Sequence, residues 1–99
     1  MITKKTSPKG RSVKVTFDLP AETASAHAAV VGDFNGWNAA KHEMKLDSKR
    51  GVWTKSISLK PGHTYEFRYL VDGERWCNDE QADAYVDNQF LSSNSIVEV

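Results

Sequence analysis

Residues 64–76, TYEFRYLVDGERW, contain the strand and the turn that decide the fold. Apolar or aromatic side chains occupy every second position of the first part, an alternation typical of a strand with one face in a core. The first set is Tyr65, Phe67, Tyr69 and Val71, and the set between them is Glu66, Arg68 and Leu70. Asp72-Gly73 then signals a tight turn that leads into Arg75 and Trp76. The stretch therefore predicts a β-hairpin.

The same alternation recurs outward from this hairpin. It is clear from Val13 to Leu19, a run that Pro20 ends. Further strands are predicted at residues 26–32, 44–46, 52–59 and 95–99. Short strands separated by turn signals predict an all-β fold, an immunoglobulin-like antiparallel β-sandwich.

The first residues of the chain show neither the period of a helix nor that of a strand. Residues 1–11 are polar and include Pro8 and Gly10, so we expect a flexible N-terminal tail over 1–11 and one β-sandwich domain over 12–99. Helical character is confined to residues 21–29 and 80–84, and the second segment is long enough for about one turn.

Composition limits the classes of partner. The chain has 99 residues, of which 39% are hydrophobic, so it can build one compact core. Thirteen Lys and Arg balance thirteen Asp and Glu, which gives no long-range attraction for nucleic acid or anionic lipid. A lone cysteine, Cys77, cannot form an internal disulfide, and no apolar run is long enough to span a bilayer. We therefore expect a cytoplasmic protein with no nucleic-acid or membrane partner.

Signatures of catalysis are missing from the sequence. The three histidines, His27, His42 and His63, are far apart and lack metal-ligand spacing, so no metal or other cofactor is expected. No nucleophile-elbow or phosphate-loop pattern occurs, and the acids are too numerous to single out a catalytic pair. The sequence favours a domain that is not an enzyme.

The three tryptophans have different contexts. Trp53 shares the parity of Ile57 and Leu59 in an apolar strand, so we expect it in the core. Trp37 follows Asn35-Gly36 in a loop, and Trp76 follows the hairpin turn among charged residues. Each of the two loop indoles either folds back over an end of the sandwich or is displayed to solvent.

A displayed pair of indoles matches the chemistry of a sugar. A pyranose ring presents an apolar C–H face and a rim of hydroxyls, so proteins stack an aromatic ring on the face and surround the rim with hydrogen-bond partners. Arg68, Asn94 and Ser92 are suitable partners for the hydroxyls.

Three motifs in order resemble carbohydrate-binding module family 48. They are residues 32–37 (GDFNGW), 65–76 (YEFRYLVDGERW) and 94–99 (NSIVEV). The family includes the glycogen-binding domain of the AMP-activated protein kinase beta subunit and the N-terminal domains of isoamylases and glycogen-branching enzymes. The resemblance covers about residues 13–99 and implies an immunoglobulin-like sandwich that binds α-1,4-glucan of the glycogen or starch type without catalysis.

The resemblance also implies a set of site residues. Trp37 and Trp76 would stack on successive glucose units, while Arg68 and Asn94 bind hydroxyls. The loop containing Phe90, Leu91 and Ser92 would reach toward the glucan. Compared with the kinase modules, Glu74-Arg75 adds one residue before Trp76, which can change the angle of that indole.

Two other functions remain open at this stage. Many members of the family pack on a neighbouring domain, so the chain is alternatively a protein-interaction module that docks on a glucan-active enzyme or a kinase complex without binding sugar. A glucan-hydrolysing enzyme is the third reading.

Overall fold

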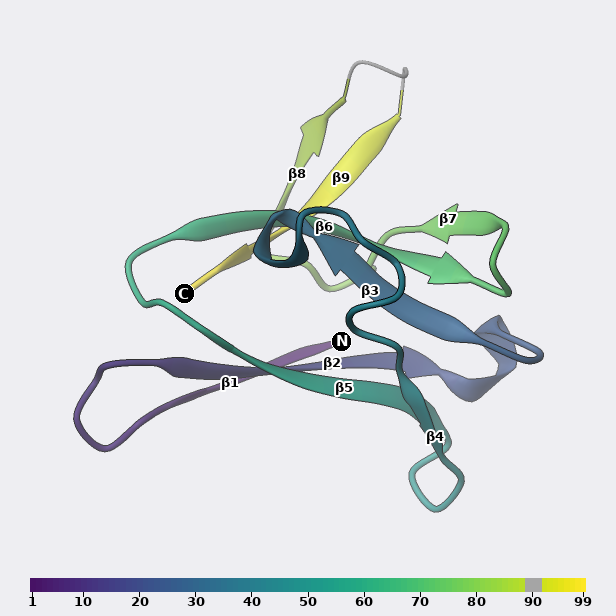
Figure 1. Ribbon diagram of the computed structural model, residues 1–99, viewed down its shortest axis with the longest axis horizontal. Helices are drawn as coiled ribbons and strands as arrows, with labels where there is room; N and C mark the ends of the chain where they lie inside the picture. Colours follow the sequence, from purple (N-terminus) through teal and green to yellow (C-terminus); the bar gives the residue numbers. More distant parts are fainter. Residues whose placement is uncertain (89–91) are drawn as a thin grey trace.

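The computed structural model describes residues 1–88 and 92–99 and contains two antiparallel sheets packed face to face (Figure 1). One sheet, called the back sheet below, has the strand order β1-β2-β5-β4. Its strands are β1 (Ile2–Thr6), β2 (Val13–Pro20), β4 (Lys45–Asp47) and β5 (Val52–Leu59). The sandwich predicted from the alternating pattern is confirmed.

The other sheet, called the front sheet, is built around β6, the strand of the opening stretch. Its strands are β3 (Ala28–Gly32), β6 (Thr64–Val71), β7 (Arg75–Cys77), β8 (Ala84–Asp87) and β9 (Ser93–Glu98). β3 pairs along one edge of β6, while β9 pairs with the first half of the other edge and β7 with the second half. β8 then pairs with β9 at the edge of the sheet.

Aromatic side chains from both sheets meet in the core. Phe17 of the back sheet contacts Phe67 of the front sheet edge to face, with ring centroids 4.9 Å apart, and Phe67 contacts Tyr69 at 5.7 Å. All three side chains are fully buried. Trp53 is also buried, with 9% of its surface exposed, which confirms its expected place in the core. Burial of such large apolar surfaces is the main force that holds the two sheets together.

Two strands were not predicted. Residues Ile2–Thr6 form β1, which pairs along its whole length with β2, where the sequence predicted a flexible tail. Four of its five residues are exposed, so no alternation marks the strand. Backbone hydrogen bonds to β2 hold it, and Ile2 packs against the core. β8 was missed for the same reason, since three of its four residues are exposed.

Helical structure is limited to short turns. Among the described residues there are two 3-10 turns, Ala21–Thr23 and Asp33–Asn35, and no α-helix. A helix able to cross a bilayer is accordingly absent from residues 1–88 and 92–99. The expected helical turn at residues 80–84 gives way to a bend that leads into β8.

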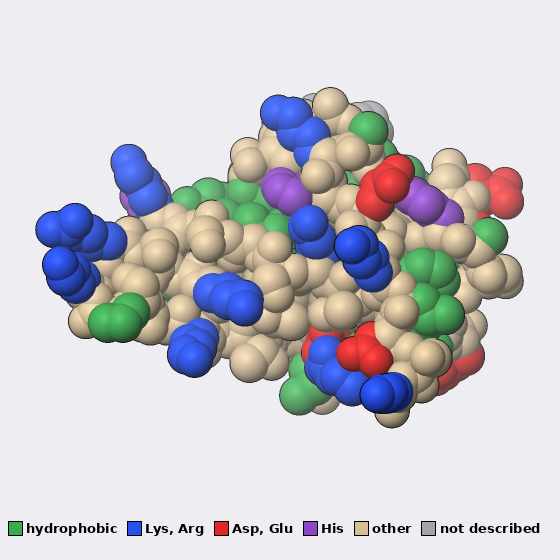
Figure 2. All heavy atoms as spheres, turned by 60° about the horizontal axis from the view of Figure 1, so that its bottom comes forward, with side chains coloured by type: hydrophobic (Ala, Val, Ile, Leu, Met, Phe, Trp, Pro, Cys, Tyr) green, Lys and Arg blue, Asp and Glu red, His purple; other side chains and the backbone are tan. Residues whose placement is uncertain are grey.

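The two outer faces of the sandwich differ in character. Figure 2 shows the side of the back sheet, over which Lys and Arg side chains are dispersed. The outer face of the front sheet carries the β6 side chains that alternate with its core residues, namely Glu66, Arg68 and Leu70. The strand register places Trp76 opposite Leu70 and Val31 opposite Arg68. Three predicted site residues, Arg68, Trp76 and Asn94, therefore belong to the front sheet.

Candidate functional site

An open hollow of about 740 Å³ lies on the outer face of the front sheet, and its volume is within the range of small-molecule sites. It is lined by Asp33, Trp37, Glu66, Arg68, Trp76, Asn88 and Asn94. Four residues predicted from the sequence, Trp37, Arg68, Trp76 and Asn94, thus meet in one place. They come from segments up to 57 positions apart, which the pairing of β3, β6, β7 and β9 brings together.

Trp37 is presented by a turn that leaves β3 at Gly32. A Cβ on Gly32 would lie 2.8 Å from the Cβ of Phe67 and would strike the carbonyl oxygen of Glu66, so only glycine allows β3 to approach β6 this closely. The chain then turns through Asp33–Asn35, and the Trp37 backbone N–H donates to the Gly32 carbonyl oxygen at 2.9 Å. The turn ends with the Trp37 backbone in the left-handed region, at φ 59°.

Asp33 holds the indole of Trp37. Its Oδ1 accepts the indole N–H at 2.9 Å, and its Oδ2 accepts the backbone N–H of Glu66 at 2.9 Å. Trp37 keeps 38% of its surface exposed. The indole is therefore displayed, with its N–H occupied and its ring face available.

A buried amide, Asn35, supports the turn from below. Its Oδ1 accepts the Gly32 N–H at 3.1 Å, and its Nδ2 donates to the Val30 carbonyl oxygen at 3.1 Å. Nδ2 also lies 2.8 Å from Nδ1 of His42, which must then be the unprotonated, accepting nitrogen of that ring. Burial, with help from the charges of Lys55 and Lys41, lowers the pKa of His42 and favours this neutral form.

Trp76 is held less tightly. It lies in β7 with 45% of its surface exposed, and its indole N–H makes no hydrogen bond to the described residues. The Arg68 guanidinium carbon lies 6.0 Å from the centre of its ring, at the limit of a cation–π contact. Arg68 Nε is buried and finds no partner in the part of the chain that the structure describes, so it is a donor in need of an acceptor.

The hairpin before Trp76 is tied down at its tip. Asp72 and Gly73 both have positive φ, 53° and 74°, as a tight hairpin turn requires. The Asp72 carboxylate accepts backbone N–H groups of Ser25, Ala26 and His27, and these bonds lower its pKa. The extra residue of the hairpin thus lies in a turn that is anchored to the loop before β3.

Asn94 belongs to a chain of polar groups. Its Nδ2 donates to Glu66 Oε1 at 3.1 Å, and its Oδ1 accepts from Asn88 Nδ2 at 3.1 Å. A carboxylate only accepts, so Glu66 fixes which end of the Asn94 amide faces it. Asn94 is 8% exposed, and since its amide nitrogen has two hydrogens, the bond to Glu66 uses one of them.

Of the remaining predicted residues, the structure describes Ser92 alone. Ser92 is half-buried and does not line the hollow; its backbone N–H donates to Asn88 Oδ1 at 3.3 Å. Phe90 and Leu91 fall outside the described residues. Asp33, Glu66 and Asn88 line the hollow but were not among the predicted residues. The parity that placed Arg68 outward also places Glu66 outward, so this residue could have been found.

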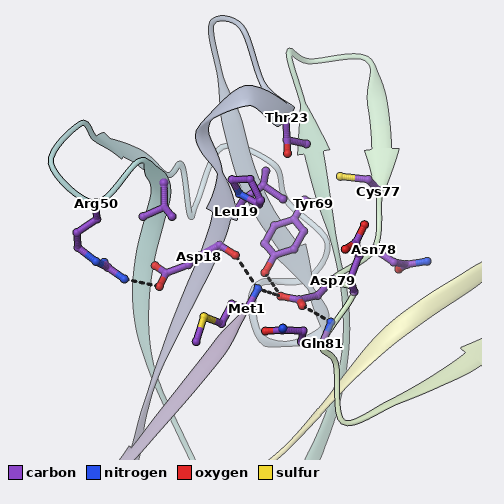
Figure 3. A pocket seen from close by; sticks show the side chains of 13 residues that line it. Met1, Asp18, Leu19, Thr23, Arg50, Tyr69, Cys77, Asn78, Asp79 and Gln81 are labelled. Atoms are coloured by element: carbon purple, nitrogen blue, oxygen red, sulfur yellow. Dashed lines mark hydrogen bonds and ion pairs between the residues drawn. The ribbon is translucent and has the colours of Figure 1, made fainter.

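A second hollow, of about 520 Å³, opens at one end of the sandwich (Figure 3). There Asp79 Oδ2 accepts the Tyr69 hydroxyl at 2.6 Å and the Met1 ammonium at 2.7 Å, while Asp18 pairs with Arg50 at 2.6 Å. Burial and the nearby Asp79 raise the pKa of Tyr69 well above its usual value. This hollow has no displayed aromatic ring, because Tyr69 is fully buried.

No metal site is found in the described part of the chain, where no three His, Cys, Asp or Glu side chains gather. Cys77 is half-buried, and burial raises the pKa of its thiol, so the reactive thiolate is disfavoured.

Comparison with curated proteins finds similarity to 1,4-alpha-glucan branching enzymes. The chain is 43% identical over 56 residues to one from Rhizobium johnstonii, covering 56% of the chain and 8% of the enzyme. It is 43% identical over 54 residues to that of Hydrogenovibrio crunogenus and 47% over 47 residues to that of Bordetella pertussis. These matches cover 54% and 46% of the chain and 7% and 6% of the enzymes.

The chain thus spans less than a tenth of the length of these relatives. Comparison with protein families matches residues 9–99 to the family described as the glycogen recognition site of AMP-activated protein kinase. This match agrees with the three motifs that resemble carbohydrate-binding module family 48. It covers every strand except β1, together with the residues that line the hollow on the front sheet, called the front hollow below. The chain belongs to the family of glycogen recognition modules of AMP-activated protein kinase.

Proposed function

We propose that the chain binds α-1,4-glucan in the front hollow and performs no chemistry on it. The observation that carries the proposal is the presence of two exposed indoles, Trp37 and Trp76, beside one buried unsatisfied donor, Arg68 Nε, in one hollow. Membership in a glycogen recognition family supports the choice of ligand.

The two indoles act as separate stacking platforms for neighbouring glucose units. Each ring covers the C–H face of one sugar, and a curved α-1,4-linked chain follows the hollow better than a flat β-linked chain. An apolar contact of a few hundred Å² contributes several kcal/mol at about 25 cal/mol per Å², before the cost of association. The dissociation constant is then expected at roughly micromolar to millimolar.

Hydroxyl groups are bound between the platforms. Arg68 supplies the buried Nε–H that lacks an acceptor, and Asn94 supplies its remaining amide N–H. Glu66 Oε1 accepts from Asn94, and the rest of its carboxylate can accept from a sugar hydroxyl. A buried donor left without a partner is costly, so a hydroxyl on Arg68 adds to affinity.

The test is a titration of the chain with maltoheptaose, followed by indole fluorescence and calorimetry. Trp37→Ala and Trp76→Ala should each weaken binding by about tenfold or more, because each removes one platform. Leu46→Ala is the matched control, since Leu46 is an apolar side chain 52% exposed on the back sheet. Unchanged affinity in both tryptophan variants contradicts the proposal, as does equal binding of a β-1,4-linked oligosaccharide.

A second candidate function is docking to a glucan-active enzyme or a kinase complex without sugar binding. It is favoured by the similarity to branching enzymes, in which the matched segment is a small part of a long chain. Failure to be retained on a glycogen resin, together with direct binding to a branching-enzyme catalytic domain added separately, would support docking over sugar binding.

A further inference from the structure

We infer that Asp33 is a positioning residue of the front hollow, whose carboxylate fixes the plane in which the Trp37 indole meets a glucose ring. The inference rests on the proposed function and adds a residue that contributes through Trp37. One carboxylate joins the loop to the sheet, because Oδ1 accepts the Trp37 indole N–H and Oδ2 accepts the Glu66 backbone N–H, both at 2.9 Å. These two bonds fix the position of the indole relative to β6, the strand that also carries Arg68. The Asp33 carboxylate with these two bonds is called the clamp below.

The backbone of Trp37 shows why such a clamp is needed. Its φ of 59° lies in a region that bulky residues rarely occupy, and it directly follows Gly36 at φ 65°. Strained conformations persist where the surroundings over-determine them, and they gather at sites that bind ligands. Here the surroundings are the Trp37 N–H bond to Gly32, the buried Asn35 and the Asp33 carboxylate.

The clamp also decides which part of the indole is free. With its N–H bonded to Asp33, Trp37 offers a ligand the face of its ring and no hydrogen-bond donor. Without Asp33, the N–H would seek water or a sugar hydroxyl, and the ring could rotate about its side-chain bonds. Each orientation that is lost on binding lowers affinity, so a ring fixed beforehand binds more tightly.

The first experiment compares affinities for maltoheptaose. Asp33→Ala should raise the dissociation constant about five- to tenfold, and Asp33→Asn should raise it less because the amide oxygen still accepts the indole N–H. Asp47→Ala is the matched control: Asp47 also accepts backbone N–H groups in a turn, those of Lys49 and Arg50, but it is the last residue of β4 on the back sheet. The affinity of the Asp47→Ala variant for maltoheptaose should not change.

The second experiment separates positioning from direct contact with sugar. Trp37→Phe keeps an aromatic ring but removes the N–H, so Asp33→Ala introduced into this variant should change the dissociation constant by less than about twofold. An undiminished effect of Asp33→Ala in the Trp37→Phe background overturns the inference, because Asp33 would then act on the ligand itself.

A spectroscopic signature follows the clamp without ligand. Of the three indole N–H resonances, that of Trp37 is the one missing in Trp37→Phe, and in Asp33→Ala it should shift and lose protection from hydrogen exchange. The amide resonances of β5 on the back sheet should stay in place. An unshifted Trp37 resonance in Asp33→Ala also overturns the inference.

The outcomes distinguish the inference from the proposed function. If Trp37→Ala weakens binding and Asp33→Ala leaves the affinity unchanged, the role of Asp33 is overturned and the proposed function stands. Unchanged binding in both Trp37→Ala and Trp76→Ala overturns the proposed function, and the role of Asp33 with it.

Discussion

Trp37 and Trp76 lie on the same face with similar exposure, 38% and 45%, but they are held in opposite ways. Trp37 sits in a strained loop whose backbone, indole N–H and underlying amide are all hydrogen-bonded. Trp76 sits in a regular three-residue strand, and the Arg68 guanidinium carbon lies 6.0 Å from the centre of its ring. The loop thus holds its indole with more hydrogen bonds than the strand does, the reverse of what secondary structure alone suggests. As the proposed stacking platforms, Trp37 is called the rigid platform and Trp76 the adjustable platform below.

The rigid platform depends on the close approach of β3 to β6, so the largest expected effect comes from Gly32→Ala. The new Cβ would strike the Glu66 carbonyl oxygen and crowd Phe67, and we expect a loss of about 1–3 kcal/mol in the free energy of unfolding with strongly weakened glucan binding. Chemical denaturation and maltoheptaose titration measure the two effects.

The control for this variant is Gly10→Ala. Gly10 has φ 66° but open space around its missing Cβ, so this change costs conformational strain alone and should leave glucan binding intact. Equal binding by Gly32→Ala and the parent chain would contradict the link between strand approach and platform.

The adjustable platform is tested by Arg68→Lys, from which we expect a smaller effect. Lysine keeps the charge but loses the planar group near Trp76 and the buried Nε–H, so the dissociation constant should rise by about three- to tenfold. Calorimetry gives the affinity, and the order parameter of the Trp76 indole should fall while that of Trp37 stays constant. A Trp37 indole that loosens as much as Trp76 would show that the two platforms are not independent.

Much of this arrangement could be read from the sequence. The parity of residues 64–71 predicted the outward position of Arg68. The turn residues placed Trp37 and Trp76 in loops and left open whether each indole is displayed or folded back, and both are exposed. The clamp was not predictable, because Asp33 reaches Glu66 across 33 positions and its partner is a backbone N–H, which leaves no mark on side-chain type. β1 was missed because a polar edge strand held by backbone bonds has no hydrophobic period.

The smallest expected effect concerns the base of the rigid platform and depends on pH. The His42 pKa is lowered in the folded chain, so below its unfolded value of 6.5 the unfolded state binds more protons and stability falls as the pH decreases. Above pH 6.5 the contribution of neutral His42 to the free energy of unfolding is fully present. Protonation of Nδ1 would also break its bond with Asn35.

Between about pH 7.5 and pH 5, the melting temperature of His42→Gln should therefore decrease less than that of the parent chain. The comparison with the parent at each pH removes the contribution of the groups that the two chains share. Superimposable pH profiles for the two chains would contradict the role of His42.

The shared edge of β6 has a consequence for how such a site can change. β7 and β9 lie end to end along that edge, so Trp76 is fixed opposite Leu70 and Ile96 opposite Glu66, whatever the length of the connections between them. An insertion in the Asp72–Glu74 turn would alter the tip of the hairpin and leave these register pairs unchanged. A different spacing needs β7 to slide by two residues at a time, since a slide of one would send the indole into the core. Under the proposed function, the spacing of the groups that β6, β7 and β9 offer to a glucan therefore follows the pleat of β6.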